Sequence, residues 1–206
     1  TGRERLQRLM RKQPFDGVWW TTLGDGNTLN LLPEALRGHG GIDFYHHLRC
    51  DILLLDGWGT PHRFRAPERR WPDGVEEYWH TEGHLATREY RTPRGTLTTV
   101  FDRGHPTRYP VDSLEALHCY RAMWEGVRFL PHDDAPALAA IDALIGEAGM
   151  VTRFWGPSTI PLLLETEMGS EQFYYFMADE PAEMAGLIAT IHARELEAFR
   201  LLAQGP

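Results

Sequence analysis

A run of four aliphatic residues, Ile52-Leu53-Leu54-Leu55, is bounded by Asp51 on one side and Asp56 on the other. An apolar run of this length between polar residues, followed at once by Gly57, is typical of a short strand buried on both faces, as in parallel sheets. In sheets and barrels built from strand–helix units, functional groups lie at the carboxyl ends of strands. The pattern therefore predicts a buried strand that places Asp56 and Trp58 at a functional edge.

Apolar residues at helical spacing predict several amphipathic helices. One covers residues 3–11, another covers residues 136–146, and a short helix is predicted over residues 161–167. A further helix is predicted to begin around Ser113, where either a Ser or an Asp is the cap residue. A long helix begins at Asp179-Glu180-Pro181, where Asp is a cap and Pro suits the first turn, and it continues to the end of the chain.

Other segments have strand patterns. Residues 15–20 are predicted to form a first strand before a glycine-rich loop, and residues 149–157 form a second short strand that leads into a loop. Residues 85–91 and 96–101 are rich in β-branched and aromatic residues, and Thr92-Pro93-Arg94-Gly95 between them has turn chemistry. These last two segments are predicted to form an antiparallel hairpin.

The order of elements is strand and helix, an inserted hairpin, then strand and helix again. This order favours an α/β fold, either a barrel or an open sheet, and no internal repeat competes with it. We expect residues 1–206 to form a single domain. Because the sequence begins without Met and stops just after a helical stretch, we expect it to be part of a longer protein.

Composition excludes some classes of partner. The net charge is -8, 42% of the residues are hydrophobic, and no apolar run approaches the ~20 residues that span a bilayer. Basic residues are scattered among acidic ones, so neither nucleic acid nor an anionic membrane is an expected partner. The two cysteines, Cys50 and Cys119, are too few for a disulfide framework, which indicates a reducing, cytoplasmic location.

Several motifs that would define a reaction are incomplete. The loop at residues 23–27 is rich in glycine but lacks the Lys-Ser/Thr of a P-loop and the spacing of a dinucleotide fingerprint. His80 and His84 are four residues apart, but Gly83 lies between them and their flanks resemble strands, so metal binding is not expected there. No Gly-x-Ser-x-Gly motif and no Cys-His pattern for a nucleophile is present.

The remaining candidates are polar and aromatic residues near the ends of predicted strands: Asp56, Trp58, His62, Arg153 and Trp155. As a catalytic group, Asp56 could move a proton, and the Arg153 guanidinium could bind and polarise a substrate. His62 lies on the following loop, and the two indoles could line an apolar pocket. The alternatives are that Asp56 only ends its strand, or that it forms a buried ion pair with Arg153 under two core tryptophans.

A set of phrases, in order along nearly the whole chain, resembles the uroporphyrinogen decarboxylase superfamily. They are Arg3-Glu4-Arg5-Leu6, Lys12-Gln13-Pro14-Phe15-Asp16, Phe44-Tyr45, Arg49-Cys50-Asp51-Ile52-Leu53-Leu54-Leu55-Asp56, Thr92-Pro93-Arg94-Gly95-Thr96-Leu97-Thr98, Val111-Asp112-Ser113-Leu114-Glu115, Met168-Gly169-Ser170-Glu171-Gln172-Phe173-Tyr174-Tyr175 and Asp179-Glu180-Pro181. The resemblance implies a (β/α)8 TIM barrel with its site at the carboxyl ends of the strands. Because such a barrel needs about 250 residues, we expect the amino-terminal part of one, with an inserted β-hairpin.

The superfamily contains decarboxylases and also methyltransferases that move methyl groups between corrinoid proteins and thiols or other acceptors. The decarboxylases have an Arg-Gln-Ala-Gly-Arg motif whose arginines hold substrate carboxylates. The matching stretch here, Thr22-Leu23-Gly24-Asp25-Gly26, has no arginine and one added acid, which is unfavourable for a substrate with many carboxylates. A tyrosine of the decarboxylases falls near Leu163, and Asp56 matches the strand-end Asp of the family only if one residue is deleted.

The hairpin and its Thr-Pro-Arg-Gly turn resemble the methyltransferase branch instead. Those enzymes activate a thiol with zinc held by His and Cys residues in the later part of the barrel, so any zinc ligands are expected outside this segment. The leading expectation is a methyltransferase with a small-molecule substrate and a corrinoid protein as methyl carrier. The alternatives are a decarboxylase, that is, a lyase acting on a porphyrinogen or smaller carboxylate, and a catalytically silent barrel that acts as a binding partner.

Overall fold

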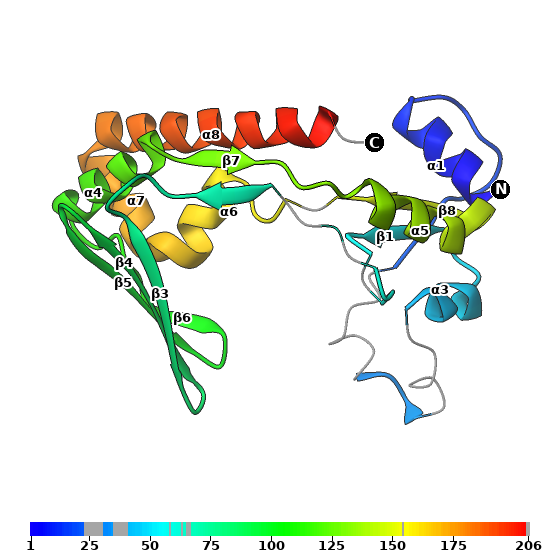
Figure 1. Cartoon of the computed structure of the whole chain (residues 1–206), viewed down its shortest axis with the longest axis horizontal. Coiled ribbons are helices and arrows are strands. Elements are labelled where there is room, and N and C mark those ends of the chain that lie inside the picture. The colour runs from blue at the N-terminus through cyan, green and yellow to red at the C-terminus, as the bar shows by residue number, and fades with distance from the viewer. Residues whose placement is uncertain are drawn as a thin grey trace. The chain divides into compact units, whose positions relative to one another are not determined.

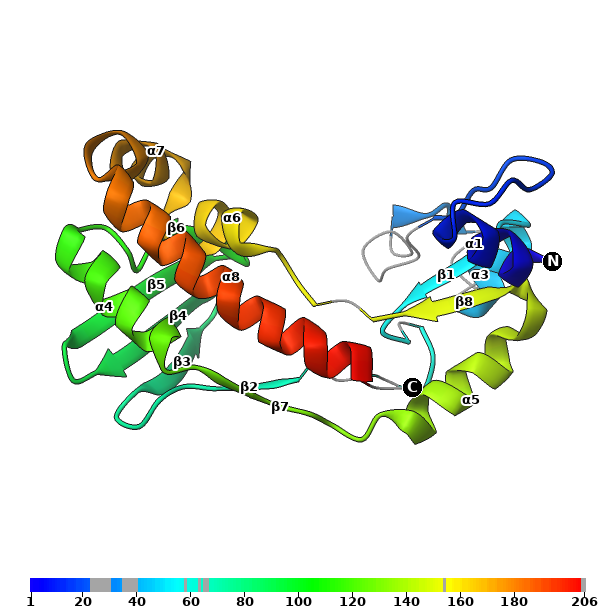
Figure 2. The same cartoon turned by 90° about the horizontal axis from the view of Figure 1, so that it is seen from above.

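The computed structural model describes residues 1–22, 31–34, 41–57, 59–62, 64, 67–153 and 155–204, and its elements are drawn in Figures 1 and 2. The chain divides into two compact units. The first unit contains residues 1–66, 132–154 and 204–206, and the second contains residues 67–131 and 155–203. Each unit has its own hydrophobic core, so each is described by itself.

The first unit is built on two parallel strands, β1 (Ile52–Leu55) and β8 (Gly149–Thr152). Their register pairs the first residue of β1 with the first residue of β8 and the last with the last. The helices of this unit are α1 (Gly2–Met10), α3 (Ile42–Leu48) and α5 (Ala135–Ile145), and the short 3-10 helix η2 (Gly146–Ala148) leads from α5 into β8.

The aliphatic run forms the centre of this unit. Ile52 and Leu54 are buried, whereas Leu53 and Leu55 are half-buried, so the strand is covered mainly on one face. The pairing also depends on Gly149, because a Cβ atom there would lie 1.9 Å from the Ile52 carbonyl oxygen. A glycine therefore lets β8 begin in close contact with β1.

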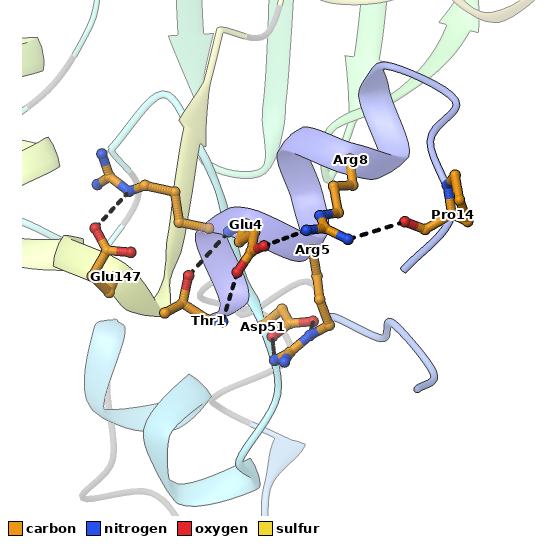
Figure 3. Close-up of polar contacts among 8 residues, drawn as sticks. Thr1, Glu4, Arg5, Arg8, Pro14, Asp51 and Glu147 are labelled. Atoms are coloured by element: carbon orange, nitrogen blue, oxygen red, sulfur yellow. Dashed lines mark hydrogen bonds and ion pairs between the residues drawn. The ribbon is translucent and has the colours of Figure 1, made fainter. Parts of the chain in front are cut away.

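Arginines of helix α1 bind the rest of the first unit (Figure 3). Arg5 donates through Nε and Nη2 to the two carboxylate oxygens of the buried Asp51, the residue before β1. Arg3 donates to the Asp142 carboxylate at 2.8 Å and to the Gly146 carbonyl at 2.7 Å. Asp51, the first carboxylate that bounds the aliphatic run, thus has a structural partner.

The second unit contains an antiparallel sheet in the order β3 (Glu76–Glu82), β4 (Leu85–Thr92), β5 (Gly95–Asp102) and β6 (His105–Arg108). A separate antiparallel pair is formed by β2 (Glu68–Arg70) and β7 (Arg128–Leu130). The turn between β3 and β4 extends away from the helices of the unit (Figure 1). Tyr90 and Leu97 of the sheet belong to the same core as the helices.

The helices of the second unit are α4 (Leu114–Glu125), α6 (Thr159–Leu162), the π-helix η3 (Leu163–Glu167), α7 (Gly169–Asp179) and α8 (Pro181–Gln204). The Ser113 hydroxyl accepts a hydrogen bond from the Ala116 N–H and caps α4, as predicted. Helix α8 starts at Pro181, as the cap pattern predicts. None of the helices in the described part of the chain is long and apolar enough to cross a membrane.

The predicted (β/α)8 TIM barrel, whole or as an amino-terminal part, is wrong, although the class is α/β. In the described residues the sheets have two, two and four strands, and β1 and β8 are the only parallel pair, so no eight-stranded barrel forms. Residues 15–20 were predicted as a strand, but they contain only bends and irregular backbone. Among the described residues, a backbone hydrogen bond from the Asp51 N–H to the Trp20 carbonyl at 3.1 Å links that segment to the start of β1.

The predicted hairpin is confirmed as β4 and β5. Leu85 pairs with Asp102, and Thr92 pairs with Gly95 across the turn. The hairpin is part of a larger antiparallel sheet, because β3 and β6 pair on its two sides. Consecutive strands in this region therefore pair with one another in antiparallel fashion. The predicted barrel would instead have alternated parallel strands with helices.

Candidate functional site

The carboxyl ends of β1 and β8 bring two of the predicted site residues together. Asp56 follows the last residue of β1, and Arg153 follows the last residue of β8. Because Leu55 pairs with Thr152, Asp56 and Arg153 leave the sheet at the same edge. The Asp56 N–H donates to the Thr152 carbonyl at 2.9 Å, so the pairing extends one residue beyond β1.

The backbone turns sharply at Asp56. Its φ is +49°, a left-handed conformation that is uncommon for a residue other than glycine, and Gly57 follows with φ +76°. A Cβ atom at Gly57 would lie 2.4 Å from the His62 carbonyl oxygen, so the loop requires a glycine there. The Phe64 N–H donates to the Asp56 carbonyl at 3.2 Å and closes the loop. The carboxylate is therefore held on a tight loop at the end of the strand, half-buried.

The Thr60 side chain forms hydrogen bonds within this loop. Its hydroxyl lies 2.8 Å from the carbonyl oxygens of both Gly57 and His62, and it accepts a hydrogen bond from the His62 N–H at 3.2 Å. His62 is thereby placed on the same closed loop as Asp56, with a half-buried side chain. The contacts of His62 that define the loop come from its backbone.

Arg153 lies between an aromatic ring and a carboxylate of the same unit. The guanidinium carbon is 5.5 Å from the centre of the Phe64 ring, and Nη1 is 3.8 Å from Asp134 Oδ2. The side chains of Arg153 and Asp134 are 18% and 6% exposed. The guanidinium carries five N–H groups. Within the described part of the chain, its polar contact is this ion pair. The guanidinium is thus oriented by its neighbours and retains donors for an anionic group.

The predicted ion pair therefore differs from the observed one. If the residues had no functional role, we expected a buried ion pair between Arg153 and Asp56. The carboxylate beside Arg153 is that of Asp134. Asp134 and Phe64 are site residues that the sequence interpretation missed. Asp134 is the N-cap residue of α5. The sequence signal that could have identified it is its position among the polar residues before the predicted helix at 136–146.

The two tryptophans are not part of this arrangement as described. Trp58 lies outside the described residues. Trp155 belongs to the second unit, where its ring packs 5.2 Å from the Phe129 ring and 6.0 Å from the Phe199 ring, measured between centres. Trp155 is partly buried against the core of that unit.

The described residues do not match a metal centre. In that part of the chain no group of three or more His, Cys, Asp or Glu side chains could hold a metal ion. His80 lies on β3, and His84 lies in the turn between β3 and β4, with Nε2 3.7 Å from Asp102 Oδ1.

Comparisons with protein-family models, with curated proteins and with solved structures found no match for this chain. A functional proposal consequently rests on the residues of the chain and on their arrangement at the β1–β8 edge.

Proposed function

We propose that the edge formed by Asp56 and Arg153 is the active site of an enzyme that acts on a small substrate with an anionic group. The observation that carries the proposal is the register of β1 and β8, which places a carboxylate and a guanidinium directly after two paired parallel strands. Carboxyl ends of parallel strands are the common location of functional groups in α/β proteins. The left-handed backbone at Asp56 is a second supporting feature, because such strain is frequent at functional sites.

We further propose that the reaction is methyl transfer to a thiol or another acceptor. This proposal is supported by the ordered phrases that resemble the uroporphyrinogen decarboxylase superfamily, and by the Thr-Pro-Arg-Gly hairpin that resembles its methyltransferase branch. It is also supported by the absence of arginine from the stretch Thr22-Leu23-Gly24-Asp25-Gly26, where decarboxylases hold substrate carboxylates. The proposal does not require a closed barrel.

The residues of the chain have distinct roles in this proposal. Arg153, steadied by Asp134 and Phe64, binds a carboxylate or phosphate of the acceptor through charge-assisted hydrogen bonds. Asp56 accepts the proton that the acceptor thiol loses when its sulfur is methylated, and the proton then passes to water. A bound corrinoid protein would supply the methyl group, and its cobalt would keep the electron pair of the broken cobalt–carbon bond.

The proposed location is the cytoplasm. Cys50 and Cys119 are both free thiols, and they lie in different units. Burial raises the pKa of the Cys50 thiol, so at neutral pH it is protonated and unreactive. Thiols of this kind persist in a reducing compartment.

The test is demethylation of methylcobalamin by the purified protein with a series of thiol acceptors, some of which carry a carboxylate. We expect thiol-dependent loss of the methylcobalamin absorbance and formation of the methyl thioether, with a preference for acceptors that carry an anionic group. Zinc content is measured on the same preparation. A protein that neither demethylates methylcobalamin nor distinguishes anionic from neutral thiols would contradict the proposal.

Decarboxylation is the second candidate, and one observation favours it. Arg153 is only 18% exposed and leaves the sheet at the same edge as Asp56. The guanidinium could bind a substrate carboxylate, and Asp56 in its protonated form could give a proton to the carbon that loses carbon dioxide. Release of carbon dioxide from porphyrinogens or smaller carboxylates, without demethylation of methylcobalamin, would select this reaction. Absence of both activities would favour a binding role.

A further inference from the structure

A buried ion pair joins the sheet of the second unit to the α6–α7 corner, which we define as residues 159–172. Arg88 of β4 donates from Nη2 to Glu167 Oε1 at 2.8 Å, and the two side chains are 10% and 1% exposed. The same nitrogen donates to the Thr99 hydroxyl of β5 at 2.9 Å. The corner is thus tied to two strands of the sheet by one guanidinium.

Glu167 occupies an irregular position in the corner. It is the last residue of the π-helix η3, a form that is rare and often found where helices adjust. Its carbonyl accepts a hydrogen bond from the Val111 N–H at 3.0 Å. Two residues later Gly169 has φ +73°, and a Cβ atom there would lie 2.6 Å from the Tyr109 ring. The corner therefore combines irregular backbone with a buried charge.

The ion pair is only half formed. Arg88 Nε and Glu167 Oε2 are buried, and neither has a hydrogen-bond partner among the described residues. These are the two atoms that a side-on guanidinium–carboxylate pair would join in its second hydrogen bond. Because both charges are out of water but incompletely paired, the closed arrangement is less stable than a bidentate pair would make it.

The first residue of the corner, Thr159, also contacts a buried carboxylate. The Thr159 hydroxyl, at the start of α6, donates to Glu195 of α8, whose side chain is buried. On another side the corner borders a hollow of about 590 Å³ that is lined by Tyr109, Met168 and Gly169 among others. Buried carboxylates therefore link residues 159–167 to α8 at their first residue and to β4 at their last, and residues 168–172 border the open hollow.

We propose that the α6–α7 corner opens and closes as one unit, and that the Arg88–Glu167 pair holds it closed. Opening separates the corner from β4, exposes the fully buried Leu163 and widens the neighbouring hollow. Leu163 and Met168 of the corner belong to the core of the second unit, but most of the buried residues of that core, such as Tyr90, Trp124 and Leu187, lie on the sheet, α4 and α8. We therefore expect the rest of the unit to stay folded. This device is independent of the β1–β8 edge and of the function proposed for it.

The test is amide hydrogen exchange of the 206-residue chain, followed by mass spectrometry of its peptides, in Glu167→Gln and in Glu165→Gln. Both variants remove one negative charge from η3, but Glu165 is exposed. We expect exchange in residues 159–172 to rise at least tenfold in Glu167→Gln and to stay unchanged in Glu165→Gln. Peptides of α4 should exchange as in the wild type.

A double-mutant cycle with Arg88→Met distinguishes a specific pair from a general loss of packing. If the pair holds the corner, exchange of residues 159–172 in the double variant is no faster than in the faster of the two single variants, because each change breaks the same contact. If instead the fold-increases of the two single variants multiply in the double variant, the proposal is overturned. Exchange that rises equally across the whole second unit, or that does not change in Glu167→Gln, would also overturn it.

Discussion

The two carboxylates that bound β1 have different surroundings and should respond differently to substitution. Asp51 is buried and accepts two hydrogen bonds from Arg5, whereas Asp56 is half-buried on the loop that follows the strand. We expect Asp51→Asn to lower the free energy of unfolding by about 1–3 kcal/mol, the cost of weakening charged hydrogen bonds. Asp56→Asn should cost less than Asp51→Asn, because the Asp56 side chain is only half-buried and Asn tolerates the left-handed backbone at this position.

Urea unfolding of the two variants measures this difference, with the exposed Asp43→Asn as a control. Equal losses in Asp51→Asn and Asp56→Asn would indicate that Asp56 is also a structural residue, which would weaken its functional role.

Two buried tyrosines of the second unit should titrate only when the protein unfolds. Burial raises the pKa of Tyr90 and of Tyr120 above the ordinary value, and the charge of Glu167 raises both further. The neutral phenols therefore stabilise the folded state fully below about pH 10, the ordinary tyrosine pKa. This contribution is lost as the pH rises through the folded-state pKa values.

We expect alkaline titration, followed by phenolate absorbance, to show a late step that coincides with loss of helical circular dichroism. The step should lose amplitude in Tyr90→Phe and in Tyr120→Phe. Ionisation of both tyrosines near pH 10 in a folded protein would contradict the buried positions.

At the scale of elements, the β1–β8 pair depends on close backbone contact. A Cβ atom at Gly149 would lie 1.9 Å from the Ile52 carbonyl oxygen, which is backbone and cannot rotate away. We expect Gly149→Ala to destabilise the first unit by more than about 3 kcal/mol, since the strands must separate.

Gly146→Ala is the matched control, because a methyl group there meets nothing within 4 Å. Its positive φ of +53° predicts a cost of only about 1–2 kcal/mol. Thermal unfolding compares the two variants, and equal losses of stability would show that the contact at Gly149 is not limiting.

The hairpin and several helices could be predicted because their signals are local. A turn sequence lies between two β-rich segments in the case of β4 and β5, and cap residues mark the starts of α4 and α8. The segment 15–20 has the same apolar character as a strand, but within the described part of the chain it forms no strand and is linked to the start of β1 by the Asp51–Trp20 backbone bond. Strand formation depends on a partner that local sequence does not specify.

At the scale of the whole molecule, the barrel could not be inferred from element order. Parallel and antiparallel strands have similar local patterns, and the described chain forms one parallel pair and two antiparallel sheets in two units. The strand-end rule named Asp56 and Arg153 as candidates. Arg153 lay within the predicted segment 149–157, and its position directly after a strand is known only because β8 ends at Thr152. Asp134 and Phe64 could not be assigned to this edge, since they reach it only through packing in the folded unit.

The central claim is that Asp56 and Arg153 act on a small anionic substrate at the β1–β8 edge. We expect Arg153→Met to raise the KM of an anionic thiol by about 10- to 100-fold, the loss of a charged hydrogen-bonding group, with little effect on a neutral thiol. Asp56→Asn should lower kcat by about 100-fold or more, because a general base is lost. Arg11→Met and Asp43→Asn, both at exposed positions, are the matched controls.

The most direct measurement is therefore the steady-state rate of methylcobalamin demethylation by the wild type and these four variants, with anionic and neutral thiols. The account predicts thiol-dependent demethylation in the wild type and both controls, a KM defect confined to anionic thiols in Arg153→Met, and a kcat defect in Asp56→Asn. Wild-type activity that neither substitution changes would contradict the assignment of the site to this edge.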